Sequence, residues 1–122
     1  MNIEIFKSLY AELPKDIFCK SLNCEIKITR AGFKHVFKER IRKGEDIKTR
    51  GLAIKYIPDL LARLNIYQQH TKKINSNGDI SYWNLQGVVN NVCLHLTIRK
   101  IGNQNLHLYS WHWKGQSPRI LK

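Results

Sequence analysis

Strict alternation of apolar and polar side chains between residues 92 and 100 is the feature that most constrains the fold of this chain. Its members are Val92, Leu94, Leu96 and Ile98 on one face and Cys93, His95, Thr97 and Arg99 on the other. A period of two is typical of a strand with one buried face. Gly102-Asn103-Gln104-Asn105 is a turn signal that leads into residues 106–114. The sequence therefore predicts a β-hairpin at this point.

The second strand of this hairpin divides its apolar residues between both faces. One side would carry His107, Tyr109, Trp111 and Trp113, and the other Leu106, Leu108, Ser110 and His112. The two assignments exclude each other unless a bulge near Ser110 re-aims the chain. The polar face is expected to combine imidazoles, a guanidinium, hydroxyls and aromatic planes, which are the groups that hold phosphates, stack bases and transfer protons.

Helical patterns precede these strands. Apolar residues from Ile3 to Leu13 are close to helical spacing, and residues 24–29 form a short extended piece. A helix is predicted over residues 30–43, with Thr29 as its N-cap and Gly44 as its end.

Residues 45–51 are interpreted as a charged loop, followed by a helix from Pro58 to about His70 and a strand over residues 80–89. Helices first and antiparallel strands afterwards predict an α+β fold, with N-terminal helices packed on one face of a C-terminal antiparallel sheet. The length suits one domain over residues 1–122, with a core over residues 25–115 and an N-terminal extension or helix over residues 1–24.

The charge balance points to a polyanionic partner, most simply RNA. Against 21 Lys and Arg stand 9 Asp and Glu, which gives a formal net charge of +12. Repulsion among these charges destabilises the compact state. Contacts with phosphates release counterions and so favour binding, which gives a functional reason for the excess of positive charge. No stretch approaches the ~20 apolar residues of a membrane span, so no membrane partner is expected.

Metal and cofactor chemistry is poorly supported. Cys19, Cys24 and Cys93 form no CxxC pair and are interpreted as reduced thiols of a protein that acts in the cytoplasm. Acidic residues are few and scattered, which disfavours a two-metal nuclease. The sequence contains no P-loop, GxGxxG, HExxH or GxSxG motif. We therefore expect no metal and no cofactor.

RNA can be cut without metal, because its own 2′-hydroxyl is the nucleophile. The protein must supply a base, a cation and an acid, and histidine suits both proton roles. His35 and His112 are the favoured pair among the five histidines, and Arg40, Arg42 or Arg99 would supply the cation. Ser110 or Thr97 would donate a hydrogen bond to the phosphate. The expected RNA-contacting residues are Lys38, Arg42, Thr97, Trp111 and Lys114.

A family resemblance rests on three stretches of the chain. Ile26 to Arg40 is an extended piece entering a helix with an early His, Ile57-Pro-Asp-Leu-Leu61 is similar to an "IPxLL" helix, and Leu108-Tyr-Ser-Trp-His-Trp113 ends a hairpin. Together with Tyr82-Trp83, these resemble the barnase/EndoU/colicin/RelE-like (BECR) ribonuclease superfamily, including its phage-encoded and contact-dependent toxin branches. The resemblance covers residues 24–115.

The resemblance implies a metal-independent endoribonuclease toxin that acts on tRNA, mRNA or rRNA and leaves a 2′,3′-cyclic phosphate. It also implies an acidic immunity or antitoxin protein as partner. By position, His35, Arg40, Arg99, Ser110 and His112 would form the catalytic set. Many relatives have a second His where this chain has Arg40.

Other readings of the same residues stay open. The main rival is a non-enzymatic RNA- or DNA-binding module that uses the same basic, aromatic face, and a third option is a basic protein that contacts a host factor. His35 beside Phe33 and Phe37 is also consistent with a half-buried packing residue, and Trp111 with sheet packing.

Overall fold

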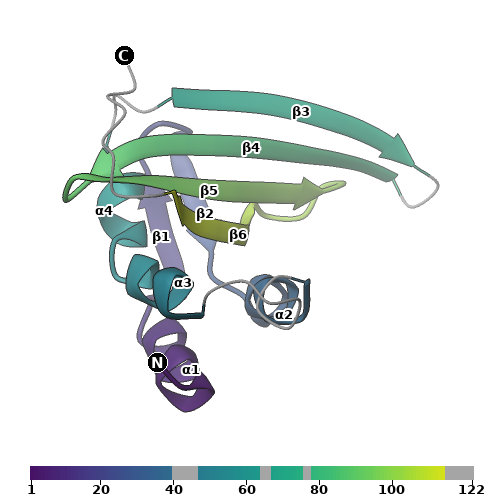
Figure 1. Cartoon of the computed structure of the whole chain (residues 1–122). Helices are drawn as coiled ribbons and strands as arrows, with labels where there is room; N and C mark the ends of the chain where they lie inside the picture. Colours follow the sequence, from purple (N-terminus) through teal and green to yellow (C-terminus); the bar gives the residue numbers. More distant parts are fainter. Residues whose placement is uncertain (40–46, 64–66, 76–77, 115–122) are drawn as a thin grey trace.

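The computed structural model describes residues 1–39, 47–63, 67–75 and 78–114 (Figure 1). In chain order, its elements are α1 (Ile3–Ala11), β1 (Asp16–Cys19), β2 (Cys24–Lys27), α2 (Arg30–Glu39), α3 (Ile47–Ile54), α4 (Ile57–Leu61), β3 (Tyr67–Asn75), β4 (Gly78–Val89), β5 (Val92–Ile101) and β6 (His107–Lys114). None of these helices is both long and apolar enough to cross a bilayer.

The strands form one six-stranded sheet in the order β1-β2-β6-β5-β4-β3. Neighbours from β3 to β6 are antiparallel, and β2 joins β6 as a parallel neighbour through the pair Lys27 and His107. The predicted α+β fold is confirmed, with helices before the C-terminal strands and packed against the sheet (Figure 1). The sheet is mixed because the N-terminal hairpin β1–β2 adds to its edge.

The core lies between the helices and the apolar face of the sheet. Its largest fully buried side chains include Phe6 of α1, Trp111 of β6 and Leu96 of β5. The ring of Phe6 stacks on Trp111 with their centroids 6.1 Å apart. These contacts explain why α1 forms here although it is short: the helix packs on α3, its Phe6 and Tyr10 rings contact Trp111, and packing supplies most of the stability of short helices.

A bulge in β6 resolves the conflict between its two candidate faces. Thr97 pairs with Ser110, whereas its neighbour Ile98 pairs with Leu108, so Tyr109 is an extra residue in β6. The alternation therefore shifts by one residue. Leu108 and Trp111 both reach the core, and Ser110 shares a face with Thr97. This is a bulge near Ser110 of the kind that would reconcile the two face assignments.

Helix α2 packs against β6 beside this bulge. Thr29 caps the helix, since its side-chain oxygen accepts a hydrogen bond from the amide of Gly32 at 3.4 Å. Gly32 is also the point of closest approach, because a Cβ there would lie 2.2 Å from the carbonyl oxygen of Leu108. The missing side chain thus sets how close α2 can come to the strand.

A Gly32→Ala variant is expected to lose about 1–3 kcal/mol of unfolding free energy, because α2 must move away from β6. Helix propensity alone predicts the opposite sign, a gain of about 0.5–1 kcal/mol. Gly51→Ala is the matched control, since a Cβ there first meets the far end of the Met1 side chain, with the Phe6 ring 3.3 Å away, rather than the backbone. Urea denaturation measures the change in unfolding free energy of both variants. A stabilised Gly32→Ala protein would contradict the close approach of α2 to β6 at Gly32.

Two sequence predictions in the middle of the chain are wrong. All of the described residues of the predicted loop at residues 45–51, namely 47–51, belong to α3, and Arg50 on that helix is buried. The helix predicted from Pro58 to His70 is limited to α4, which ends at Leu61, while His70 lies in strand β3. Of the predicted helix over residues 30–43, α2 accounts for Arg30–Glu39, and residues 40–44 lie outside the described residues.

Candidate functional site

The sheet face opposite the core carries a block of polar side chains on its three central strands. Successive register positions place β4, β5 and β6 residues side by side in three rows, which we call the polar face. The rows are Tyr82, Arg99 and His107; then Asn84, Thr97 and Ser110; then Gln86, His95 and His112. None of the nine is acidic, so this face suits an anionic ligand.

The first row is extended by Tyr109 and by His35 of α2. The His35 and Tyr109 rings stack with centroids 3.9 Å apart, and the Arg99 guanidinium carbon lies 4.0 Å from the centre of the Tyr109 ring. Two groups at such short distances cannot share one side of a ring, so Tyr109 is sandwiched between them. Tyr82 meets the edge of the same ring at 5.9 Å.

His107 holds the Arg99 side chain in this position. The Nε of Arg99 donates a hydrogen bond to Nε2 of His107 at 3.1 Å, which requires that nitrogen to be unprotonated. Burial of the imidazole and, to a smaller extent, the positive charge of Arg99 lower the pKa of His107, while a backbone hydrogen bond at Asn105 opposes them. A neutral His107 thus positions the guanidinium and leaves its charge available to a ligand.

The other two rows combine a hydroxyl pair with a pair of imidazoles. The Thr97 hydroxyl lies 3.2 Å from the side-chain oxygen of Asn84 and donates a hydrogen bond to it, and Ser110 opposite is buried. In the last row, His95 and His112 face each other with ring centroids 4.7 Å apart. Rows on one face of a strand are about 7 Å apart, so these imidazoles lie about two rows from Arg99.

The structure brings most of the sequence-predicted catalytic residues to this face. His35 and Arg99 meet at Tyr109, and Ser110 and His112 occupy the next two rows. The ring partner of His112 is His95, whereas that of His35 is Tyr109. Arg40 lies outside the described residues.

The predicted RNA-contacting residues are scattered. Thr97 belongs to the polar face, Lys38 is exposed on α2, and Lys114 ends β6, where it pairs with Cys93. Arg42 lies outside the described residues. Trp111 is 0% exposed, so the prediction that it contacts RNA is wrong. The bulge turns it into the core, where its indole nitrogen donates a hydrogen bond to the carbonyl of Arg50 at 2.9 Å.

The β4 members of the polar face and the roles of His107 and Tyr109 were not predicted from the sequence. Tyr82, Asn84 and Gln86 alternate with Trp83 and Leu85, a period-two signal that was available in the sequence. The contact between Tyr109 and His35 joins β6 to α2, and no local pattern predicts it.

The described residues contain no group of three or more His, Cys, Asp or Glu side chains placed to hold a metal ion. Comparison with protein-family models, with curated proteins and with solved structures gives no match for this chain. The resemblance to BECR ribonucleases therefore stays a prediction, and the residues of the polar face are the structural basis for assigning a function.

Because the pKa of His107 is lowered in the fold, acidification should weaken the protein through this residue. In the unfolded chain, the His107 imidazole titrates near pH 6.5 and binds a proton more readily than it does in the fold. The stability that the neutral imidazole contributes is therefore lost as the pH falls below about 6.5. Urea denaturation between about pH 7.5 and about pH 5.5 should show a steeper loss for wild type than for His107→Gln. Parallel pH dependences would contradict the assignment.

Proposed function

We propose that this protein is a metal-independent endoribonuclease that cleaves RNA by attack of the 2′-hydroxyl, leaving a 2′,3′-cyclic phosphate. The observation that carries the proposal is the sandwich of Tyr109 between His35 and Arg99, on a face without acidic residues. An imidazole for proton transfer and a fixed guanidinium for phosphate charge are the two groups that this chemistry needs.

Each step of the reaction has a candidate group. His35 takes the proton of the 2′-hydroxyl, the 2′-oxygen bonds to phosphorus, and Arg99 stabilises the negative charge of the phosphorane. His112, on the far row, gives a proton to the 5′-oxygen as the bond from phosphorus to that oxygen breaks. In-line displacement places the entering and leaving oxygens on opposite sides of phosphorus, so base and acid must act from two ends of the site.

This proposal extends to the cellular setting that the resemblance to BECR ribonucleases implies. The substrate would be tRNA or another cellular RNA in the bacterial cytoplasm, and an acidic immunity or antitoxin protein would restrain the enzyme. The high positive charge, +12, supports a polyanionic substrate in any of these settings.

The experiment is incubation of purified protein with total bacterial RNA in excess EDTA, followed by a denaturing gel and mapping of the new ends. Discrete cuts that end in cyclic phosphate are expected. Cleavage that EDTA abolishes would contradict the metal-independent mechanism.

A binding module without catalysis is the second candidate, and strand β3 favours it. Residues 68–73 of β3 are all exposed and include Lys73, whose ammonium lies 5.7 Å from the centre of the Tyr82 ring, which suits contact with a phosphate backbone beside the polar face. Intact RNA in the same incubation, together with a salt-sensitive shift on a native gel, would support this candidate and exclude the enzyme.

A further inference from the structure

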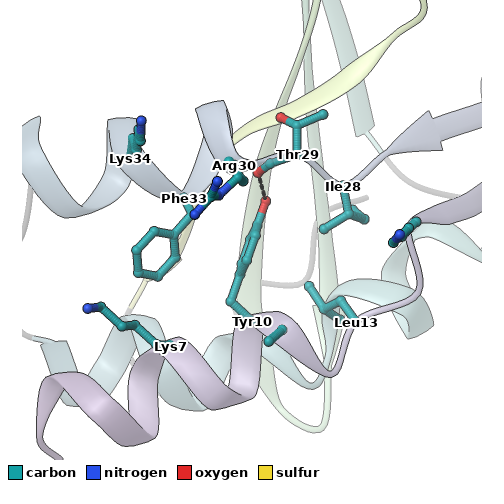
Figure 2. Close-up of a pocket in the computed structure, with 10 residues that line it drawn as sticks. Lys7, Tyr10, Leu13, Ile28, Thr29, Arg30, Phe33 and Lys34 are labelled. Carbon is teal, nitrogen blue, oxygen red and sulfur yellow. Dashed lines mark hydrogen bonds between the residues drawn. The ribbon is translucent and has the colours of Figure 1, made fainter.

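A separate cavity of about 460 Å³ lies between the C-terminal half of α1 and the start of α2. Figure 2 shows Tyr10 and Leu13 rising from the α1 side, with Ile28 and Phe33 opposite them. None of its lining residues belongs to the nine positions of the polar face. It is therefore distinct from the candidate ribonuclease site.

The cavity has an apolar floor and a positive rim. Its cationic members are Lys7, Lys15, Arg30 and Lys34, which come from α1, the segment after it and α2. All four are exposed, and no lining residue is acidic. Figure 2 shows Lys7 and Lys34 on opposite sides of the Phe33 ring. A ligand that fits must combine an apolar group with negative charges around it.

The apolar floor of the cavity favours some ligands over others among those that combine an apolar group with negative charges. The Tyr10 hydroxyl already donates a hydrogen bond to the carbonyl of Thr29 at 2.6 Å, and burial raises the pKa of this tyrosine, so it stays neutral. Around it lie Leu13, Ile28 and Phe33. A nucleobase would bring several polar edge groups to this floor and leave them unpaired, which is costly. A hydrocarbon side chain has no such groups.

The charge of the whole chain disfavours a second copy as the natural occupant. Two molecules with a formal net charge of +12 each repel one another, and four of the positive charges of each molecule lie on the cavity rim itself. Attraction requires a partner of the opposite sign.

We propose that this cavity docks an acidic segment of another protein, which inserts one aliphatic or aromatic side chain between α1 and α2. The inserted side chain supplies most of the affinity by burying apolar surface. Carboxylates on either side of it meet the lysines and the arginine of the rim, which speeds the encounter and fixes the orientation. The inference does not rest on ribonuclease activity, because no residue of the polar face takes part.

The test is a titration of the ¹⁵N-labelled full chain with short glutamate-rich peptides, followed by two-dimensional NMR. One peptide carries a central leucine, a second has serine at that place, and a third has lysines in place of the glutamates. The leucine peptide should shift the amide signals around Tyr10, Thr29 and Phe33, and the other two should bind at least about tenfold more weakly. No RNA is present, so a failed ribonuclease assay would leave the result unaffected.

Matched variants locate the site. Lys34→Glu should weaken binding of the leucine peptide at least about threefold, whereas Lys20→Glu should not, although it makes the same change in net charge. Lys20 is exposed and lies outside the cavity. Ala11→Trp, at an exposed lining position, should block insertion.

Three outcomes would overturn the proposal. One is the absence of shifts with the leucine peptide at the highest soluble concentration. Another is equal binding of the leucine and serine peptides, which would make the contact purely electrostatic. The last is tighter binding of adenosine monophosphate or dodecanoate at the same residues, which would assign the cavity to a nucleotide or a fatty acid.

Discussion

Replacement of His35 by glutamine is expected to lower the rate of RNA cleavage by about 10²–10⁴-fold, because general acid–base catalysis by one positioned group contributes that much. Glutamine keeps a polar side chain of similar reach beside Tyr109 but cannot exchange a proton near neutral pH. RNA affinity should change by less than about threefold, since it depends mainly on contacts between cations and phosphates. Initial rates on a fluorogenic oligoribonucleotide, and separate binding curves in the same buffer, measure the two effects.

His70→Gln is the matched control for this variant. His70 also stacks on an aromatic ring, that of Trp83 at 4.7 Å, but it lies exposed on β3 outside the polar face. Its replacement should leave the rate unchanged. Full activity of His35→Gln would remove His35 from the mechanism, and equal losses in both variants would point to a general effect of histidine removal on the fold.

Trp111→Ala is expected to cost about 3–5 kcal/mol of the free energy of unfolding, which is the usual range for truncation of a buried tryptophan. The indole is fully buried against Phe6 and Tyr10, with ring centroids 6.1 and 5.3 Å away. Its loss would also leave the carbonyl of Arg50 without the indole donor. Because small domains have only about 5–15 kcal/mol in total, the variant should be largely unfolded in mild urea. Far-UV circular dichroism during urea denaturation measures this loss.

Trp111→Phe separates the two contributions. It keeps a six-membered aromatic ring in the core but removes the donor to Arg50 together with part of the ring volume, so a smaller loss of about 1–3 kcal/mol is expected. Trp113→Ala provides a comparison on the same strand, at a residue that is only partly buried. A Trp111→Ala protein as stable as Trp113→Ala would contradict the central place of Trp111 in the core.

The sequence predicted the β5–β6 hairpin because its faces differ sharply in polarity, and it failed at β3 because that strand has no such contrast. β3 lies at the edge of the sheet with β4 as its one neighbour, and residues 68–73 are exposed on both sides. A strand that buries neither face has no reason to alternate. The predicted helix that begins at Pro58 therefore continued past the leucines of α4 into the residues that form β3.

Arg50 shows a different limit of sequence reasoning. Its neighbours Lys48 and Gly51 are typical of a solvated loop, and arginine is seldom buried without partners. In the fold, an Arg50 guanidinium nitrogen donates a hydrogen bond to the carbonyl of Trp111, while the indole of Trp111 donates one to the carbonyl of Arg50. This reciprocal pair joins segments far apart in the chain, so a local pattern cannot reveal it. The same holds for His35 and Tyr109.

The position of β6 in the sheet has a consequence for the order of folding during synthesis. β6 is the last described strand along the chain, yet it lies between β2 and β5 in the sheet. The N-terminal hairpin and the β3–β5 ribbon therefore cannot join in one sheet until the β6 residues have left the ribosome. Synthesis proceeds at about 5–20 residues per second. Tyr109, His107 and His112 arrive with that strand, so the nascent chain holds no assembled polar face before β6 emerges.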